Sequence, residues 1–160
     1  MTERSSGQQL ALDQLFDIAH RSVGALEIIG EPRDSEKDGV VWVDLSLATR
    51  SYQAGGLALR DRERLQLAMH ADFPFQLPWL FFKHKRFVGA PHVQWGRFIC
   101  LYQSPETEWV PADGLFGFFD RVVEWFTAAG AGELDPDDAP LHPPVAYIRS
   151  STVFVMGADA

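Results

Sequence analysis

Cys100 is the residue of this sequence with the clearest capacity for covalent chemistry. It is the single cysteine in 160 residues, so the chain can form neither an internal disulfide nor a site built from several thiolates. A thiol can attack an activated carbonyl and hold the acyl group as a thioester. A lone cysteine is also often an inert buried residue. The residues around Cys100 are needed to distinguish a nucleophile from such a packing residue.

The other titratable residues form no site of a familiar type. Metal-ligand spacing is absent among the histidines of the middle and later chain, which are His70, His84, His92 and His142, so no metal site is expected. Gly55-Gly56 is not followed by a Lys-Ser or Lys-Thr pair, which excludes a Walker-type phosphate loop. No cofactor is expected, and any adenylation must come from another domain or protein.

The composition excludes several classes of partner. A formal net charge of -8 and a pI near 5.0 would repel a phosphate backbone, so nucleic acid is not expected to bind. No stretch approaches the roughly 20 apolar residues that span a bilayer, and the polar start of the chain does not resemble a signal peptide, which favours a soluble cytoplasmic protein. The basic run Lys83-His84-Lys85-Arg86 is expected to be a solvated turn, with contact to an acidic partner as the alternative.

Hydrophobic periodicity predicts the elements that would position Cys100. Apolar residues at steps of three and four predict an amphipathic helix from Leu10 to about Gly24. Alternating or β-prone segments predict strands at residues 25–29, 40–47, 64–69 and 79–82. Turn residues from Pro32 to Gly39 separate the first two strands, so a four-stranded antiparallel meander is expected.

Cys100 falls between this meander and a second predicted helix. From Phe87 to Glu108 no period persists, but the aromatic and aliphatic content is too high for a solvated loop, so an ordered coil is expected. The second helix is predicted to have Asp113 as its N-cap and Gly130 just beyond its end. Trp109 is expected to pack and to set this helix beside the cysteine.

The order of helix, meander, coil and helix predicts an α+β domain. We expect it to cover residues 8–148, with residues 149–160 as a C-terminal tail. The apolar residues between Val145 and Met156 could form a terminal strand on the core or the start of a link into another domain.

Four motifs in this order resemble those of the ubiquitin-conjugating enzymes. They are FPFQLP at 73–78, PHVQ at 91–94, GRFICL at 96–101 and WVP at 109–111. The family has Tyr-Pro-Phe-x-x-Pro, His-Pro-Asn, Gly-x-Ile-Cys-Leu and Trp-Ser-Pro at these places. The resemblance implies a ubiquitin-conjugating-enzyme-like fold, with an N-terminal helix, a four-stranded antiparallel meander, a catalytic coil and a second helix.

The resemblance also implies roles for individual residues. Cys100 is the acyl-carrying nucleophile. Gln94 stands where the family has asparagine, so it is the candidate oxyanion-stabilising or positioning group, although it could equally anchor the coil through a backbone carbonyl. His92 is expected to organise the coil, with an acid or base role as the alternative. Asp138 lies where a carboxylate could orient the incoming amine, although a solvated turn is the plainer interpretation.

The departures from the family pattern, including Val93 in place of proline, resemble a reduced bacterial branch that contains the conjugating proteins of antiphage (CBASS-type) signalling islands. This implies a protein partner that supplies its C-terminal carboxyl, either a cyclic-dinucleotide-synthase-like nucleotidyltransferase or a ubiquitin-like protein, and an adenylating enzyme where the carboxyl needs activation. Two alternatives stay open. One is a non-catalytic partner-binding module on the same fold, and the other is a cysteine hydrolase that uses Cys100 and His92, for which no third orienting group is evident.

Overall fold

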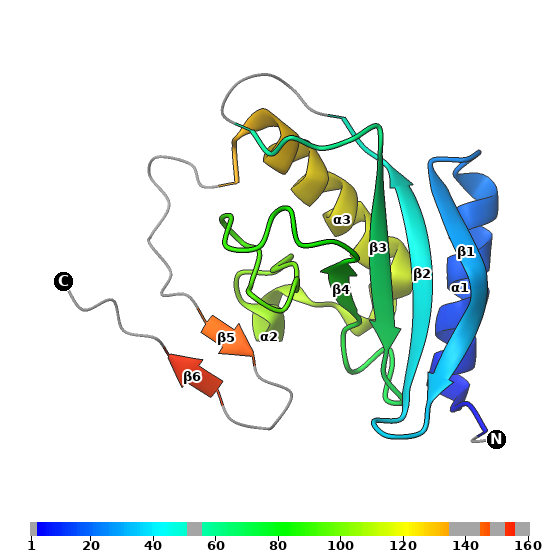
Figure 1. Cartoon of the computed structure of the whole chain (residues 1–160). Helices are drawn as coiled ribbons and strands as arrows, with labels where there is room; N and C mark the ends of the chain where they lie inside the picture. The colour runs from blue at the N-terminus through cyan, green and yellow to red at the C-terminus, as the bar shows by residue number, and fades with distance from the viewer. Residues whose placement is uncertain (1–2, 51–55, 135–144, 148–152, 156–160) are drawn as a thin grey trace.

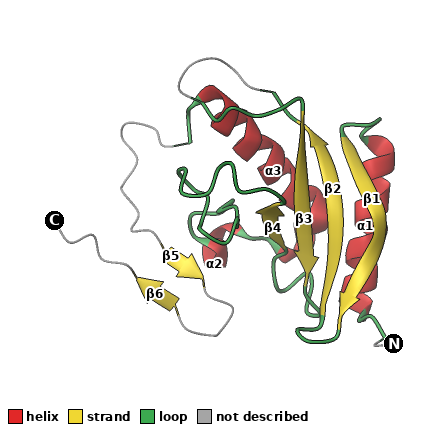
Figure 2. Ribbon diagram, in the orientation of Figure 1, coloured by secondary structure: helices red, strands yellow, loops and turns green. Residues whose placement is uncertain are grey.

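The computed structural model describes residues 3–50, 56–134, 145–147 and 153–155. Figure 1 shows an N-terminal helix, a sheet of consecutive strands, a long coil and a second long helix in chain order. The two long helices lie on the same side of the sheet (Figure 2), and the hydrophobic core fills the space between these layers. The predicted α+β architecture is confirmed.

Helix α1, Ser6–Arg21, begins at a capping box. The Ser5 hydroxyl accepts a hydrogen bond from the Gln8 backbone N–H (3.1 Å), and the Gln8 side chain accepts one from the Ser5 backbone N–H (3.0 Å). This reciprocal pair satisfies two donors that a helix start leaves open, so α1 begins four residues before the predicted Leu10. The face turned to the core carries Ala11, Leu12 and Leu15.

The strands β1, β2, β3 and β4 form one antiparallel sheet in sequence order, as predicted. Their bounds are Leu26–Ser35, Val40–Ala48, Arg62–Met69 and Trp79–Phe82. Successive side chains of a strand point to opposite faces of the sheet. On β2 and β3 the residues that face the helices are therefore the alternate apolar ones, which are Val41, Val43, Leu45, Leu65, Leu67 and Met69.

Strand β1 is longer than predicted. The sequence predicts a turn from Pro32 to Gly39, whereas β1 continues through Pro32 to Ser35. The pairing with β2 shifts register between Ile29 and Arg33, and β1 lies at the edge of the sheet. A proline has no N–H to donate, and an edge strand with an irregularity is where a sheet accommodates it.

Helix α3, Gly114–Ala131, differs from its prediction at both ends. Asp113 directly precedes it, but its side chain makes no capping hydrogen bond. Gln14 of α1 instead accepts a hydrogen bond from the Leu115 backbone N–H at 2.8 Å. At the other end Gly132, not Gly130, takes the left-handed conformation (φ 74°) that lets the chain turn away.

Four short elements complete the described structure. The coil before α3 contains α2, Pro105–Glu108, and a single 3-10 turn at Pro111–Asp113. Strands β5, Val145–Tyr147, and β6, Val153–Val155, pair with each other in a separate two-stranded sheet. The division into a domain of residues 8–148 and a tail stays a prediction. No helix of the described chain has the length and apolar character to cross a membrane.

Candidate active site

Cys100 lies at the end of a short extended segment that pairs with the last strand of the sheet. Phe98 forms an antiparallel bridge with Phe81 of β4. The Ile99 backbone N–H donates to the Leu80 carbonyl at 2.9 Å. The segment that carries the cysteine is therefore held by sheet-like pairing, which is more regular than the predicted coil.

The same segment folds back on the residues before it. Val93 forms an antiparallel bridge with Ile99, and the Cys100 backbone N–H donates to the His92 carbonyl at 2.8 Å. Val93 (5% exposed) and Ile99 (1% exposed) belong to the core. Because side chains alternate along extended chain, Gln94 and Cys100 both point away from the core and are only half-buried. Local pairing thus places the two predicted site residues on one side of a small hairpin.

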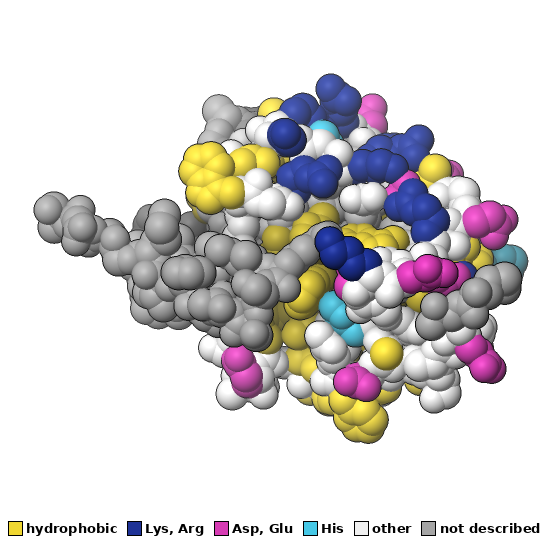
Figure 3. Space-filling model, turned by 60° about the horizontal axis from the view of Figure 1, so that its bottom comes forward, with side chains coloured by type: hydrophobic (Ala, Val, Ile, Leu, Met, Phe, Trp, Pro, Cys, Tyr) yellow, Lys and Arg dark blue, Asp and Glu magenta, His cyan; other side chains and the backbone are white. Residues whose placement is uncertain are grey.

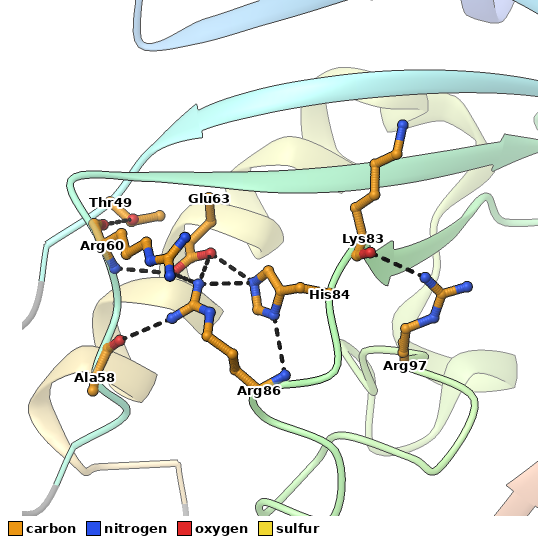
Figure 4. Close-up of polar contacts among 8 residues, drawn as sticks. All are labelled: Thr49, Ala58, Arg60, Glu63, Lys83, His84, Arg86 and Arg97. Atoms are coloured by element: carbon orange, nitrogen blue, oxygen red, sulfur yellow. Dashed lines mark hydrogen bonds and ion pairs between the residues drawn. The ribbon is translucent and has the colours of Figure 1, made fainter.

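A tight turn joins the two arms of this hairpin. The Arg97 backbone N–H donates to the Gln94 carbonyl at 2.9 Å, and Arg97 has a left-handed φ of 69°. A left-handed residue after such a turn is a common way to close a short hairpin. Trp95 stands at the tip and is 79% exposed. The Arg97 guanidinium also donates to the Lys83 carbonyl at 3.1 Å (Figure 4), which ties the turn to the segment after β4.

The Cys100 thiol has one amide donor beside it. The Gln94 Nε2 lies 3.5 Å from Sγ and donates a hydrogen bond to it. Burial raises the pKa of Cys100, and the Gln94 hydrogen bond opposes that shift without cancelling it. Since the thiolate is the nucleophilic form, the isolated protein holds Cys100 mainly as an unactivated thiol at neutral pH.

The remaining predicted site residues are placed only in part. His92 accepts a hydrogen bond from the Cys100 N–H through its backbone carbonyl and has a left-handed φ of 63°, while the coil-organising role predicted for its imidazole stays a prediction. An acid or base role for its imidazole stays a prediction. Asp138 lies outside the described residues. Among the residues that are described, no group of His, Cys, Asp and Glu side chains could hold a metal ion.

A hollow of about 390 Å³ opens between the residues that follow Cys100 and helix α3. Its lining is rich in carboxylates and consists of Tyr102, Glu108, Trp109, Val110, Asp113, Gly117, Asp120, Arg121 and Glu124. Burial raises the pKa of Tyr102 to about 12, so this phenol is neutral across the physiological range. The two sides of the hollow come from segments that are separate in sequence. Arg121 was not identified from the sequence as a site residue, and the one local signal was that Arg121 is the single basic residue of α3.

Trp109 packs as predicted. Its ring makes edge contacts with Tyr102 and Phe118, with centroid distances of 6.2 and 6.4 Å. The indole N–H donates to the Pro74 carbonyl at 2.8 Å. These contacts join the loop after β3 to the segment between Cys100 and α3.

The basic run after β4 is an exposed turn, as predicted, with Lys83, Lys85 and Arg86 exposed, and three of its four side chains also pair with carboxylates of the sheet. Glu63 of β3 is fully buried (0% exposed), and its carboxylate accepts hydrogen bonds from Arg86 Nη2 at 2.6 and 2.8 Å (Figure 4). His84 Nε2 lies 2.7 Å from the same carboxylate, and Lys83 pairs with Asp44. A buried carboxylate requires such partners, so this run ties the segment after β4 to the sheet.

Charge is unevenly distributed over the surface. Figure 3 shows the visible Lys and Arg side chains gathered in the upper part of one face, although the chain carries a formal net charge of -8. Helix α3 and the segment before it are acidic by contrast, with Glu106, Glu108, Asp120 and Glu124 exposed.

Comparison with known proteins identifies both a family and a fold. The model of prokaryotic E2 family A matches residues 11–160. A solved structure of human ubiquitin-conjugating enzyme E2 G1 is similar to this chain, with a TM-score of 0.54, 17% sequence identity, and coverage of 76% of this chain and 95% of that chain. No curated protein matches the sequence. At this identity the structural likeness shows the fold alone, and the ubiquitin-conjugating fold predicted from the motifs is confirmed.

Proposed function

We propose that this chain, which belongs to prokaryotic E2 family A, carries an acyl group on Cys100 as a thioester and passes it to an amine. Membership of that family makes the protein a conjugating-enzyme-like transferase that interacts with protein partners. The observation that supports the finer proposal is the Gln94 amide at 3.5 Å from the sulfur of the chain's single cysteine.

In the loading step, the Cys100 sulfur attacks the carbonyl carbon of an activated C-terminal carboxyl. The activated group is an acyl adenylate or a thioester on another protein. A C–S bond forms, the bond to the leaving adenylate or thiol breaks, and the thiol proton passes to the leaving group or to a base of the partner. Because burial raises the pKa of Cys100, the activated donor and its docking must supply the reactivity that the free thiol lacks.

In the transfer step, an amine attacks the thioester carbonyl. A C–N bond forms, the C–S bond breaks, and the thiolate of Cys100 recovers the proton that the amine loses. Negative charge develops on the carbonyl oxygen next to the sulfur, and in this proposal the Gln94 amide, which donates to the sulfur in the free protein, donates to that oxygen. His92 holds the coil, and Asp138 orients the amine in this proposal.

The proposed acyl donor is a cyclic-dinucleotide-synthase-like nucleotidyltransferase or a ubiquitin-like protein, in antiphage defence. The motif resemblance to the bacterial antiphage branch supports this choice. In this proposal the activated carboxyl comes from an adenylating domain or an adenylating enzyme, since these 160 residues contain no Walker-type phosphate loop. The proposed location is the cytoplasm, where ATP-dependent activation of a carboxyl takes place.

A non-catalytic partner-binding module is the second candidate function. The raised pKa and half-burial of Cys100 favour it, because reactive cysteines usually have a lowered pKa. The same observation speaks against a cysteine hydrolase, which would need a self-activated thiol paired with an imidazole.

The test is to isolate the protein from cells that also express its neighbouring genes and to measure its intact mass, with and without a thiol reductant. We expect a thiol-sensitive adduct that Cys100→Ala abolishes, and whose mass identifies the donor. Cys100→Ser should hold the same acyl group as an ester that resists the reductant. No adduct in the presence of an active donor would leave the binding module as the better description.

A further inference from the structure

Arg121 reaches from helix α3 to the residue that follows Cys100. Its Nε donates a hydrogen bond to the Leu101 carbonyl at 2.7 Å. Its guanidinium carbon lies 5.4 Å from the centroid of the Tyr102 ring, and Nη2 lies 3.7 Å from Glu108 Oε1. One side chain therefore contacts three residues of the segment between the cysteine and α3.

Glu108 extends this contact along the backbone. Its Oε2 accepts hydrogen bonds from the Gln103 N–H at 2.7 Å and from the Ser104 N–H at 3.1 Å. The sheet-like pairing of the hairpin reaches as far as Cys100, and the chain then leaves the sheet. Beyond that point Arg121 and Glu108 provide partners for backbone groups that strand pairing no longer satisfies.

The hydrogen bond to Leu101 is the contact that matters most. Arg121 also approaches Glu124 at 3.7 Å, but the Glu124 side chain is 70% exposed, and such surface pairs contribute little to stability. A charged donor on a backbone carbonyl is stronger than a neutral one and fixes the direction of the acceptor. The acceptor of this hydrogen bond is the carbonyl of Leu101, the residue directly after Cys100. The geometry of the hydrogen bond therefore affects the position of Sγ.

We propose that Arg121 is a positioning residue for Cys100, which holds the chain after the cysteine so that Sγ stays half-buried beside the Gln94 amide. This inference rests on the proposed function for its catalytic consequence. The placement of the thiol itself can be tested without any partner, because Cys100 is the single cysteine and reports on its own surroundings.

The first test measures the rate of alkylation of Cys100 by iodoacetamide as a function of pH. Arg121→Met keeps the apolar stem of the side chain and removes its hydrogen bond. The freed segment should expose the thiol, so the midpoint of the pH profile should fall and the rate near neutral pH should rise, on the order of tenfold for one pKa unit. Arg121→Lys, which keeps a cationic donor, should restore part of the wild-type behaviour.

Two further variants make this test decisive. Arg21→Met removes an exposed arginine of α1 that pairs with Asp17, and it should leave the profile unchanged. Glu108→Gln weakens the same segment without altering α3 and should move the profile in the direction of Arg121→Met, which keeps the test valid if that variant folds poorly. A wild-type profile for both folded Arg121→Met and Glu108→Gln would overturn the inference.

The second test measures the discharge of a preformed thioester to an added amine. For Arg121→Met we expect the limiting rate to fall about tenfold or more, because a small displacement of a reacting group is costly. The amine concentration at half the limiting rate should not change, since Arg121 acts on the sulfur and not on the amine. If the wild-type protein forms no thioester, the proposed function fails, and the alkylation profiles still decide the role of Arg121.

Discussion

At Cys100 two opposing effects act on one thiol. Burial disfavours the thiolate and is the larger effect, whereas the Gln94 N–H favours the thiolate by donating to it. The same amide would favour the oxyanion of a tetrahedral intermediate on the neighbouring carbonyl. One Gln94 amide can therefore stabilise both the thiolate and the oxyanion of the transition state. A side chain that only anchors the coil would stabilise neither.

Replacing Gln94 with alanine separates these roles. Gln94→Ala should raise the midpoint of the Cys100 alkylation profile, because the thiolate loses a donor while its burial remains. This is the opposite sign to the shift expected for Arg121→Met. If the amide also stabilises the oxyanion, the discharge of the thioester should slow by about 10²-fold. An unchanged discharge rate together with a raised midpoint would limit Gln94 to the thiol.

His70 is a buried residue whose ionisation should affect stability. It packs edge-on against Trp79 with centroids 4.4 Å apart, and its Nε2 has no hydrogen-bond partner in the described part of the chain. Burial lowers its pKa, an effect that the charges of Asp38 and Asp72 only partly oppose. The folded protein therefore binds this proton less readily than the unfolded chain does.

The sign of the pH dependence follows from this difference. Above about pH 6.5 His70 is mainly neutral in both the folded and the unfolded protein, so its ionisation does not lower the free energy of unfolding. As the pH falls below that value the unfolded chain takes up the proton first, so stability is lost at up to about 1.4 kcal/mol per pH unit until the folded pKa is reached. His70→Leu should flatten this slope in urea unfolding between about pH 7 and pH 5, and the exposed His20→Leu should not. An equal slope in both variants would assign the effect to other groups.

At the scale of elements, the segment after β4 is held to the sheet by a buried carboxylate of β3. Glu63 is buried at the start of β3, and Nη2 of Arg86, from the segment after β4, donates to both of its carboxylate oxygens. The Arg60 backbone N–H also donates to this carboxylate, at 2.9 Å. Charges inside the protein are costly unless they are paired, so this cluster determines where the segment leaves the sheet.

Removing the partner of a buried charge should therefore destabilise the protein strongly. Arg86→Met leaves the Glu63 carboxylate with weaker partners and should lower the free energy of unfolding by about 3 kcal/mol. Lys85→Met is the matched control, because Lys85 is exposed in the same segment and its loss should change stability by less than about 0.5 kcal/mol. Denaturant unfolding measures both. Similar losses in the two variants would contradict an anchoring role for the Glu63 cluster.

At the scale of the whole molecule, the fold tolerates wide sequence change. The chain shares 17% identity with human ubiquitin-conjugating enzyme E2 G1 and still aligns over 76% of its length with a TM-score of 0.54. What a fold of this kind requires is an apolar stripe on each helix and alternation on each strand, and many residues satisfy that pattern. This explains why periodicity predicted the layers although few identities remain.

The sequence by itself determined the elements and the candidate nucleophile. The two long helices, the four strands of the main sheet and the identity of the single thiol follow from local periodicity and composition, which act over a few residues. The errors concern features that depend on a neighbour in space. Strand β1 extends through Pro32 because β2 pairs with it, and Gln14 rather than Asp113 supports the start of α3 because α1 packs beside it.

Only the tertiary structure decided which side chains meet. Arg121 and Leu101 are 20 residues apart, Arg86 and Glu63 are 23 apart, and Gln14 and Leu115 are 101 apart. A long polar side chain can choose among many partners, and its choice depends on which backbone and charged groups the packed core brings within hydrogen-bond distance. Local sequence does not specify those distances. The contacts that position Cys100 can therefore be identified only from the packed structure.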